Sequence, residues 1–306
     1  MRASEVDLSA AVGGVELASL VLTASGTSGH DDELAAYGEL KELGAVVVKS
    51  LSVMPWRGNP SPRVAPVGEG MLNAVGLQGP GVAAWRSEGL PRLLARGVTV
   101  VASIWGRTVD EFAAAAEALQ GADVAAVEVN VSCPNLHDGS AMFAHSPAAT
   151  AAAVVAAGRS GLPRWAKLSP TTDRLTDVAR AAVDAGADAL VLVNTLRGVV
   201  VDVERRASAL GSLAGGLSGP PLHPVALHCV TSCRAALPDT PIVGVGGVRS
   251  EREVVGFVLA GCDAVEVGTA ALADPRAPWR ILEATRRWCA RHDVARLGTL
   301  KGQLHD

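Results

Sequence analysis

Short apolar runs recur along the chain, separated by longer stretches that are rich in alanine and charged residues. Most runs are continuously apolar rather than alternating, which is typical of parallel strands covered on both faces. There are eight of them, at residues 17–25, 45–50, 98–103, 124–132, 164–169, 189–195, 241–247 and 264–269. We expect each run to form one strand of a parallel sheet.

The stretches between the runs carry helical patterns, most clearly at residues 31–44, 108–121, 175–188 and 252–263. Strands that alternate with helices indicate βαβ units. Eight such units favour a closed (β/α)8 TIM barrel, an α/β fold, over the alternative of an open doubly wound sheet. No Pro-rich or Ser-rich linker divides the chain, so we expect a single domain over residues 1–306.

Two connections are too long for plain barrel loops, residues 51–97 after the second strand and 196–220 after the sixth. Long connections inside a compact domain usually serve binding, so we expect both near the functional site.

Composition narrows the class of protein. The chain has 306 residues, of which 49% are hydrophobic and 19% charged, with a formal net charge of −4. This balance excludes a disordered chain, and without a block of Lys or Arg nucleic acid is not an expected partner. The N-terminus lacks the features of a signal peptide, and no long apolar segment is free of charged and turn residues. We expect a soluble, cytoplasmic protein without a membrane helix.

The five cysteines are scattered and odd in number, and no C-x-x-C pair occurs. They indicate neither a disulfide framework nor a metal site. Cys229, Cys233 and Cys262 have the surroundings of packing residues. Cys133 differs because it follows the fourth apolar run within Asn130-Val-Ser-Cys-Pro-Asn135, with polar neighbours where a strand enters a loop.

Candidate binding residues occur at the carboxyl ends of the expected strands, where barrel active sites lie. Lys49 and Lys167 each close an apolar run, and a buried lysine needs an anionic or accepting partner, so a ligand shared by both is favoured. Gly246-Gly247 and Gly268-Thr269 end the last two runs, where barrels commonly bind phosphate. The alternative for these glycines is that they only make tight turns.

Several of these motifs occur together in one known family. The segments RGNPSPR (57–63), NAVGLQGPG (73–81), NVSCPN (130–135), LVLVNT (190–195) and GGLSGPPLHPVAL (215–227), with the two glycine motifs, resemble those of dihydroorotate dehydrogenases in order and spacing. The resemblance covers residues 15 to 290. NAVGLQGPG is closer to the type 1B enzymes, which work with an iron–sulfur flavoprotein subunit, than to the fumarate-using type 1A. Membrane-bound type 2 enzymes have an N-terminal helical extension and a serine base, whereas this chain has Cys133 at that position.

The resemblance implies FMN-dependent oxidation of (S)-dihydroorotate to orotate in de novo pyrimidine (UMP) biosynthesis. Cys133 would be the base that removes the proton from C5, and the hydride of C6 would pass to N5 of FMN. It further implies a homodimer and an electron-transfer subunit carrying FAD and a [2Fe-2S] cluster. FMN would contact Ser25, Lys49, Ser50, Ser103, Asn130, Lys167, Val193, Gly219, Gly246, Gly247, Gly268 and Thr269. The substrate would contact Lys49, Asn73, Ala74, Val75, Gly76, Leu77, Asn130, Asn135, Asn194 and Thr195.

One departure from the family pattern leaves two further functions open. Ser103 stands where the family has a flavin-contacting asparagine, and Trp105 follows two residues later. The first alternative is therefore a related FMN oxidoreductase acting on another dihydropyrimidine-like substrate. The second is a catalytically silent FMN-binding subunit, against which the intact Cys133, Lys49 and asparagine set argues.

Overall fold

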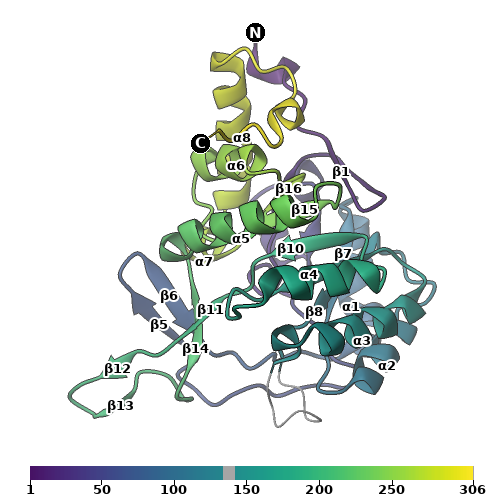
Figure 1. The fold of residues 1–306 in the computed structure, drawn as a ribbon, viewed down its shortest axis with the longest axis vertical. Helices are drawn as coiled ribbons and strands as arrows, with labels where there is room; N and C mark the ends of the chain where they lie inside the picture. Colours follow the sequence, from purple (N-terminus) through teal and green to yellow (C-terminus); the bar gives the residue numbers. More distant parts are fainter. Residues whose placement is uncertain (134–141, 306) are drawn as a thin grey trace.

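A computed structural model describes residues 1–133 and 142–305, and its centre is a closed barrel of eight parallel strands (Figure 1). The barrel strands are β3 (Val21–Thr23), β4 (Val46–Val47), β7 (Val100–Ile104), β8 (Ala126–Asn130), β9 (Arg164–Leu168), β10 (Ala189–Leu192), β15 (Ile242–Val245) and β16 (Ala264–Val267). Seven of them lie within a predicted run, and β7 extends one residue beyond the run at 98–103. The barrel prediction is confirmed, and the open-sheet alternative is wrong.

The strand residues are almost all buried, since the inner face fills the barrel and the outer face is covered by helices. Closure follows from the parallel registers, in which β16 pairs with β3 and β10 pairs with both β9 and β15. The helices are α1 (Val82–Ala95), α2 (Val109–Glu117), α3 (Pro147–Ala157), α4 (Leu175–Asp184), α5 (His223–Ala236), α6 (Glu251–Leu259), α7 (Thr269–Ala273) and α8 (Ala277–Arg291). Among the described residues no helix is both long and apolar enough to span a membrane.

Three of the four predicted helices are present as α2, α4 and α6. Side chains at two helix starts supply hydrogen bonds to the first turn, Thr108 for α2 and Ser250 for α6. The prediction of a helix over 31–44 is wrong, because this segment forms only short 3-10 turns at Glu33–Ala36 and Leu40–Glu42. Gly38 between them packs against the indole of Trp279, and a Cβ there would lie 2.5 Å from the ring. The other 3-10 turns among the described residues are Ala3–Glu5, Phe143–His145, Gly158–Ser160, Pro220–Leu222 and Leu297–Leu300.

An antiparallel hairpin of β1 (Ala10–Val12) and β2 (Val15–Leu17) precedes the first barrel strand. Its buried side chains Val12, Val15 and Leu17 join the main core. The hairpin thus covers the amino-terminal side of the barrel.

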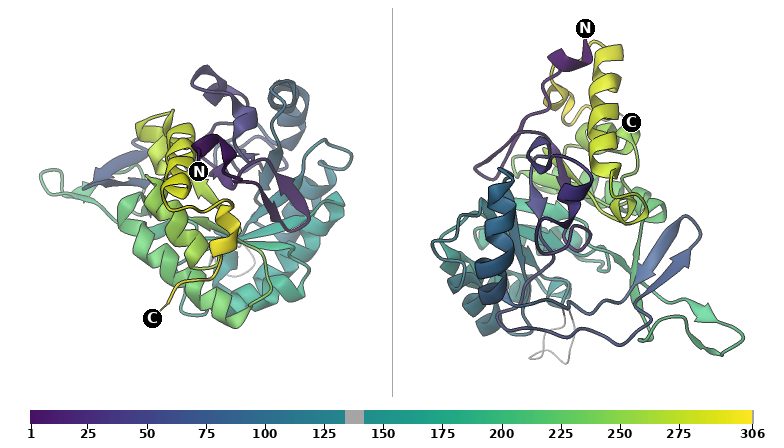
Figure 2. Two further views of the ribbon diagram at one scale, coloured as in Figure 1. Left: turned by 90° about the horizontal axis from the view of Figure 1, so that it is seen from above. Right: turned by 180° about the vertical axis from the view of Figure 1, so that it is seen from behind.

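A second sheet stands at the carboxyl ends of the barrel strands. Its order is β11 (Leu196–Gly198), β14 (Gly215–Ser218), β6 (Gly70–Asn73) and β5 (Val64–Val67), and every pairing is antiparallel. It is built from the two long connections that follow β4 and β10. A small hairpin of β12 (Val201–Asp202) and β13 (Ala207–Ser208) projects beyond it, as both Figure 1 and the right view of Figure 2 show.

Candidate active site

A cavity of about 870 Å³ lies between the mouth of the barrel and the second sheet. This volume is within the range of small-molecule and cofactor pockets, about 300–1,000 Å³. Residues predicted as contacts from widely separated segments line it together: Ser25, Lys49, Ser50, Asn73, Ala74, Val75, Gly76, Leu77, Asn130, Lys167, Val193, Asn194, Thr195, Gly219, Gly246, Gly247, Gly268 and Thr269. The structure therefore assembles at one place most of the residues that the motifs single out.

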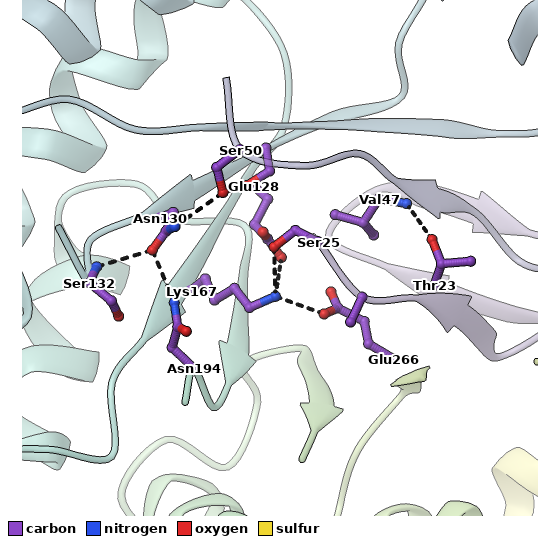
Figure 3. A network of polar contacts seen from close by, with 12 residues as sticks. Thr23, Ser25, Val47, Ser50, Glu128, Asn130, Ser132, Lys167, Asn194 and Glu266 are labelled. Atoms are coloured by element: carbon purple, nitrogen blue, oxygen red, sulfur yellow. Dashed lines mark hydrogen bonds and ion pairs between the residues drawn. The ribbon is translucent and has the colours of Figure 1, made fainter. Parts of the chain in front are cut away.

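Asn130 at the end of β8 is the centre of a polar network (Figure 3). Its Nδ2 donates to Ser50 Oγ at 3.1 Å, while its Oδ1 accepts from Asn194 Nδ2 at 3.1 Å and from the Ser132 backbone N–H at 3.1 Å. Ser103 does not line the described cavity wall. It is fully buried and shares a hydrogen bond of 2.9 Å with Ser50 Oγ, so it supports the network from behind.

Lys167 lies on β9 with its ammonium among buried acceptors (Figure 3). Its Nζ donates to Glu266 Oε2 at 2.9 Å, to Glu128 Oε2 at 3.1 Å and to Ser25 Oγ at 3.1 Å. Burial lowers the pKa of Lys167, but the two carboxylates outweigh burial and hold that pKa above its ordinary value. Lys167 is thus a charged lysine at the floor of the cavity.

Lys49 follows β4 and is a second, partly buried cation of the cavity wall. Burial and the neighbouring charge of Lys167 together lower the pKa of Lys49 to about 8, against the opposing effect of Glu128. Gly26 faces this side chain, and a Cβ at Gly26 would lie 3.4 Å from Lys49 Nζ. Lys49 is therefore poised to pair with an anionic ligand near neutral pH.

Glycines form the wall at the ends of the last two barrel strands. Gly246 and Gly247 have φ values of +135° and +73°, which disfavour any other residue. A Cβ on Gly247 would also lie 3.0 Å from the carbonyl oxygen of Gly219. Gly268 precedes α7, and Thr269 Oγ1 donates to Ser218 Oγ at 2.8 Å. Backbone groups without side chains can be approached closely, so this wall suits the phosphate of a nucleotide cofactor such as FMN.

Cys133 is fully buried, and it is not among the residues that line the described cavity. The thiol donates to the carbonyl oxygens of Gly106 at 2.9 Å and Asn130 at 3.4 Å. Burial raises the pKa of Cys133 to about 12, so this environment does not favour a thiolate. The adjacent Ser132 does line the cavity, and its buried hydroxyl has no hydrogen-bond partner among the described residues. The role of Cys133 as base remains a prediction, and the predicted substrate contact Asn135 lies outside the described residues.

The sequence motifs did not single out several residues that the structure places here. Glu128 and Glu266 bind Lys167, and both interrupt otherwise apolar runs, which is the signal that could have revealed them. At the rim, Trp105 packs edge to face with Trp56 at a centroid distance of 5.7 Å, and the guanidinium of Arg107 lies 4.7 Å from the Trp56 ring. Trp105 Nε1 is buried without a hydrogen-bond partner in the described part of the chain.

Known proteins resemble the chain over nearly its whole length. The family model described as dihydroorotate dehydrogenase matches residues 7–287. A protein of Desulforudis audaxviator is 44% identical over 303 residues, covering 98% of both chains. One of Geobacter sp. strain M21 is 41% identical over 300 residues, covering 97% of this chain and 98% of its own. Both are named dihydroorotate dehydrogenase B (NAD(+)), catalytic subunit, as is a protein of Solidesulfovibrio magneticus that is 42% identical over 303 residues. The predicted resemblance, including its closeness to the B type, is confirmed, and the chain belongs to the dihydroorotate dehydrogenase family.

Proposed function

We propose that this protein is the FMN-dependent catalytic subunit that oxidises (S)-dihydroorotate to orotate in pyrimidine biosynthesis. The relatives of the same length carry the name of this activity, with NAD⁺ as acceptor. The observation that carries the proposal is the cavity itself, because lysines, asparagines and glycines from separate strand ends line one space of suitable size. We take residues 1–306 as one FMN-binding domain.

The cofactor would lie with its phosphate against Gly246, Gly247 and Gly268 and with its ring system toward Asn130 and Lys167. When bound, FMN supplies the acceptor for the hydride removed from C6 of the substrate. The ammonium of Lys167 stabilises negative charge at the ring, and the Ser50–Asn130 network holds hydrogen-bonding groups fixed beside it.

The substrate would bind over Asn73, Asn194 and Thr195, with the segment Ala74–Leu77 supplying backbone groups. Dihydroorotate is an anion with several amide groups, so asparagines match its ring and the charge of Lys49 matches its carboxylate. Oxidation also requires removal of the proton at C5. Cys133 would accept it as a thiolate, once its thiol has left the Gly106 carbonyl, reached the cavity and released its own proton to solvent.

Two kinds of protein partner belong to the proposal. The phrase "catalytic subunit" in the relatives' names supports a second subunit, for which we propose an FAD and [2Fe-2S] protein that takes electrons from FMN. We further propose a homodimer. Support comes from a projecting arm, residues 199–213, which contains the β12–β13 hairpin. Its side chains Val199, Val201, Val203 and Leu213 have relative exposures of 52–75%, which leaves apolar surface for contact with another chain.

Anaerobic reduction of the purified protein tests the function. The visible spectrum should show bound flavin, and dihydroorotate should bleach it whereas dihydrouracil should not. Bleaching by dihydrouracil instead would support the related dihydropyrimidine oxidoreductase that Ser103 and Trp105 suggest. Bound flavin that neither compound reduces would identify a catalytically silent FMN-binding subunit.

A further inference from the structure

Three ionisable side chains meet inside the barrel below the cavity. Glu128 comes from β8, Lys167 from β9 and Glu266 from β16, and β8 and β16 are separated by three strands on one side of the barrel and three on the other. Lys167 Nζ therefore lies near the barrel axis, between carboxylates that approach from opposite walls at 3.1 and 2.9 Å (Figure 3). Both glutamates are fully buried, whereas Lys167 reaches the cavity wall.

The charges of these three groups do not balance among themselves if each is ionised, and the nearby Lys49 lines the cavity, where its charge faces the ligand. One ammonium and two carboxylates leave a net negative charge in the barrel interior, where an uncompensated charge is strongly unfavourable. Each glutamate also has a second oxygen, Oε1, that is buried without a hydrogen-bond partner in the described chain. A proton held on one carboxyl group would make the cluster neutral.

The surroundings single out Glu266 as the carboxyl that keeps this proton. Burial and the charge of Glu128 together raise the pKa of Glu266 to about 8, against the opposing effect of Lys167. The paired positions on the neighbouring strands, Val245 on β15 and Leu22 on β3, carry no charge. Among the described residues, Lys49 also interacts with Lys167 and Glu128, so two cations favour the ionised form of Glu128, whereas Lys167 is the cation that acts on Glu266.

We propose that Glu128 and Glu266 are positioning residues that hold Lys167 Nζ at the cavity floor and offset its charge, so that the proton on Glu266 sets how readily the bound cofactor is reduced. The proposal rests on the proposed function only in taking that cofactor to be FMN. Reduction adds negative charge to the flavin, and a neutral cluster with its ammonium toward the ring favours this more than a cluster with a net negative charge. The carboxyl groups act through Lys167, since neither is part of the described cavity wall.

The midpoint potential of the flavin in the holoprotein, measured against pH, tests the coupling. Glu266→Gln should match the wild type near about pH 6, where the glutamate is protonated, and exceed it above about pH 8, where the wild type gains a negative charge. Glu128→Gln should raise the potential at both pH values, because it removes the carboxylate that balances Lys167. Potentials of Glu266→Gln and wild type that coincide at every pH would overturn the proposal.

The flavin-free protein provides a second measurement that does not depend on the cofactor. A carboxyl whose folded-state pKa is raised keeps its proton while the unfolded chain releases it, so folded stability decreases between about pH 5 and about pH 8. The melting temperature of Glu266→Gln relative to wild type should therefore rise over this interval. Glu283→Gln is the matched control, since Glu283 is exposed on α8, and its difference from wild type should stay constant.

A third readout uses the wild type alone and so does not require any variant to fold. Its infrared spectrum should contain the band of a protonated carboxyl at about pH 7 that disappears above about pH 8. Without that band the buried proton, and with it the proposal, is refuted. The proposal would also be refuted if the band is present but the difference in flavin midpoint potential between Glu266→Gln and wild type does not change with pH. That result would show a buried proton that does not act on the cofactor. Failure of the proposed function would appear elsewhere, as flavin that dihydroorotate does not reduce.

Discussion

Cys133 and Ser132 are adjacent in the sequence but face different surroundings. The thiol is buried against the carbonyl oxygen of Gly106, whereas Ser132 is one of the residues that line the cavity. A thiol with a pKa of about 12 holds its proton at neutral pH and so provides almost no thiolate to act as a base. Catalysis by Cys133 therefore requires the side chain to leave this position. The two residues are thus competing candidates for the proton transfer, and substitution can separate them.

We expect Cys133→Ser to keep FMN and to lose about 10²–10⁴-fold in turnover with dihydroorotate, which is the usual contribution of a general base. Serine is similar in size, so packing should survive while the acidity of the group falls. Ser132→Ala should keep most of the turnover, and Cys229→Ser on α5 is the control for loss of a buried thiol away from the cavity. Steady-state turnover of each variant at full FMN occupancy measures these effects. A larger loss of turnover in Ser132→Ala than in Cys133→Ser would assign the base to Ser132.

The pKa of Lys49 predicts how binding of an anionic ligand depends on pH. Below about 8 the side chain is an ammonium that can pair with a carboxylate, and above it the neutral amine cannot. The dissociation constant of orotate should therefore increase roughly tenfold or more as pH rises through this value, since hydrogen bonds to charged groups contribute about 1.5–3 kcal/mol. Titration of the oxidised protein with orotate measures this.

Lys49→Arg should flatten the pH profile because the guanidinium keeps its charge. Lys301→Ala, which removes a lysine paired with Asp263 on the surface, should leave the profile of the wild type. A dissociation constant that does not change with pH in the wild type would remove Lys49 from ligand binding.

At this scale the sequence predicts residues that follow a buried strand and misses those whose role depends on distant partners. Lys49, Asn130 and Asn194 each end or follow an apolar run, so the regular geometry of a barrel places them at its mouth. The contacts of Lys167 with Glu128 and Glu266 join opposite walls of the barrel, and no local pattern reports such contacts. The orientation of Cys133 depends on a carbonyl 27 residues away.

At the scale of elements, the two long connections act as one structure. Asn73 Nδ2 of β6 donates to the carbonyl oxygen of Gly216 in β14, across 143 residues of sequence. The lengths of the connections predicted that they serve the site, but their pairing into a sheet could not be predicted because each strand has only three or four residues. The helix predicted at 31–44 is absent for a similar reason, since Gly38 contacts Trp279, a residue far away in the sequence.

Gly216 provides a test of this sheet. A Cβ at Gly216 would collide with Oγ1 and Cβ of Thr195, so Gly216→Ala should displace Thr195 from the cavity wall. We expect the KM for dihydroorotate to rise about tenfold, the effect of losing one hydrogen bond. Gly198→Ala on the adjacent strand β11 is the matched control, because its Cβ would meet only Leu72 at 3.4 Å. Equal KM values in the two variants would contradict the placement of Thr195.

At the scale of the whole molecule, the barrel was the most predictable feature. Its eight strands are recognisable one by one as buried apolar runs, and closure follows from their number and alternation with helices. The partners of the molecule are less predictable, because the residues that bind another protein need no repeating pattern.

We predict that the isolated chain accepts electrons from dihydroorotate but passes them only slowly to NAD⁺. The cavity is taken up by FMN and substrate, and the sequence has no Rossmann fingerprint for a nicotinamide site. Adding an FAD and [2Fe-2S] subunit should restore NAD⁺ reduction. Stopped-flow reduction followed by mixing with NAD⁺ or fumarate measures both rates. Fast reoxidation by NAD⁺ without a partner would refute this prediction, and fast reoxidation by fumarate would favour a type 1A enzyme.

The first and last described segments of the chain are held together by backbone hydrogen bonds. The N–H of Asp7 donates to Ala295 at 2.8 Å, and that of Leu297 donates to Asp7 at 3.4 Å. Both segments lie beside α8, at the end of the molecule opposite the β12–β13 hairpin (Figure 1). An affinity tag or surface anchor attached at either end would therefore hold the molecule with the mouth of its barrel facing outward. On an electrode or sensor chip, such a layer would present every cavity to the solution in the same orientation.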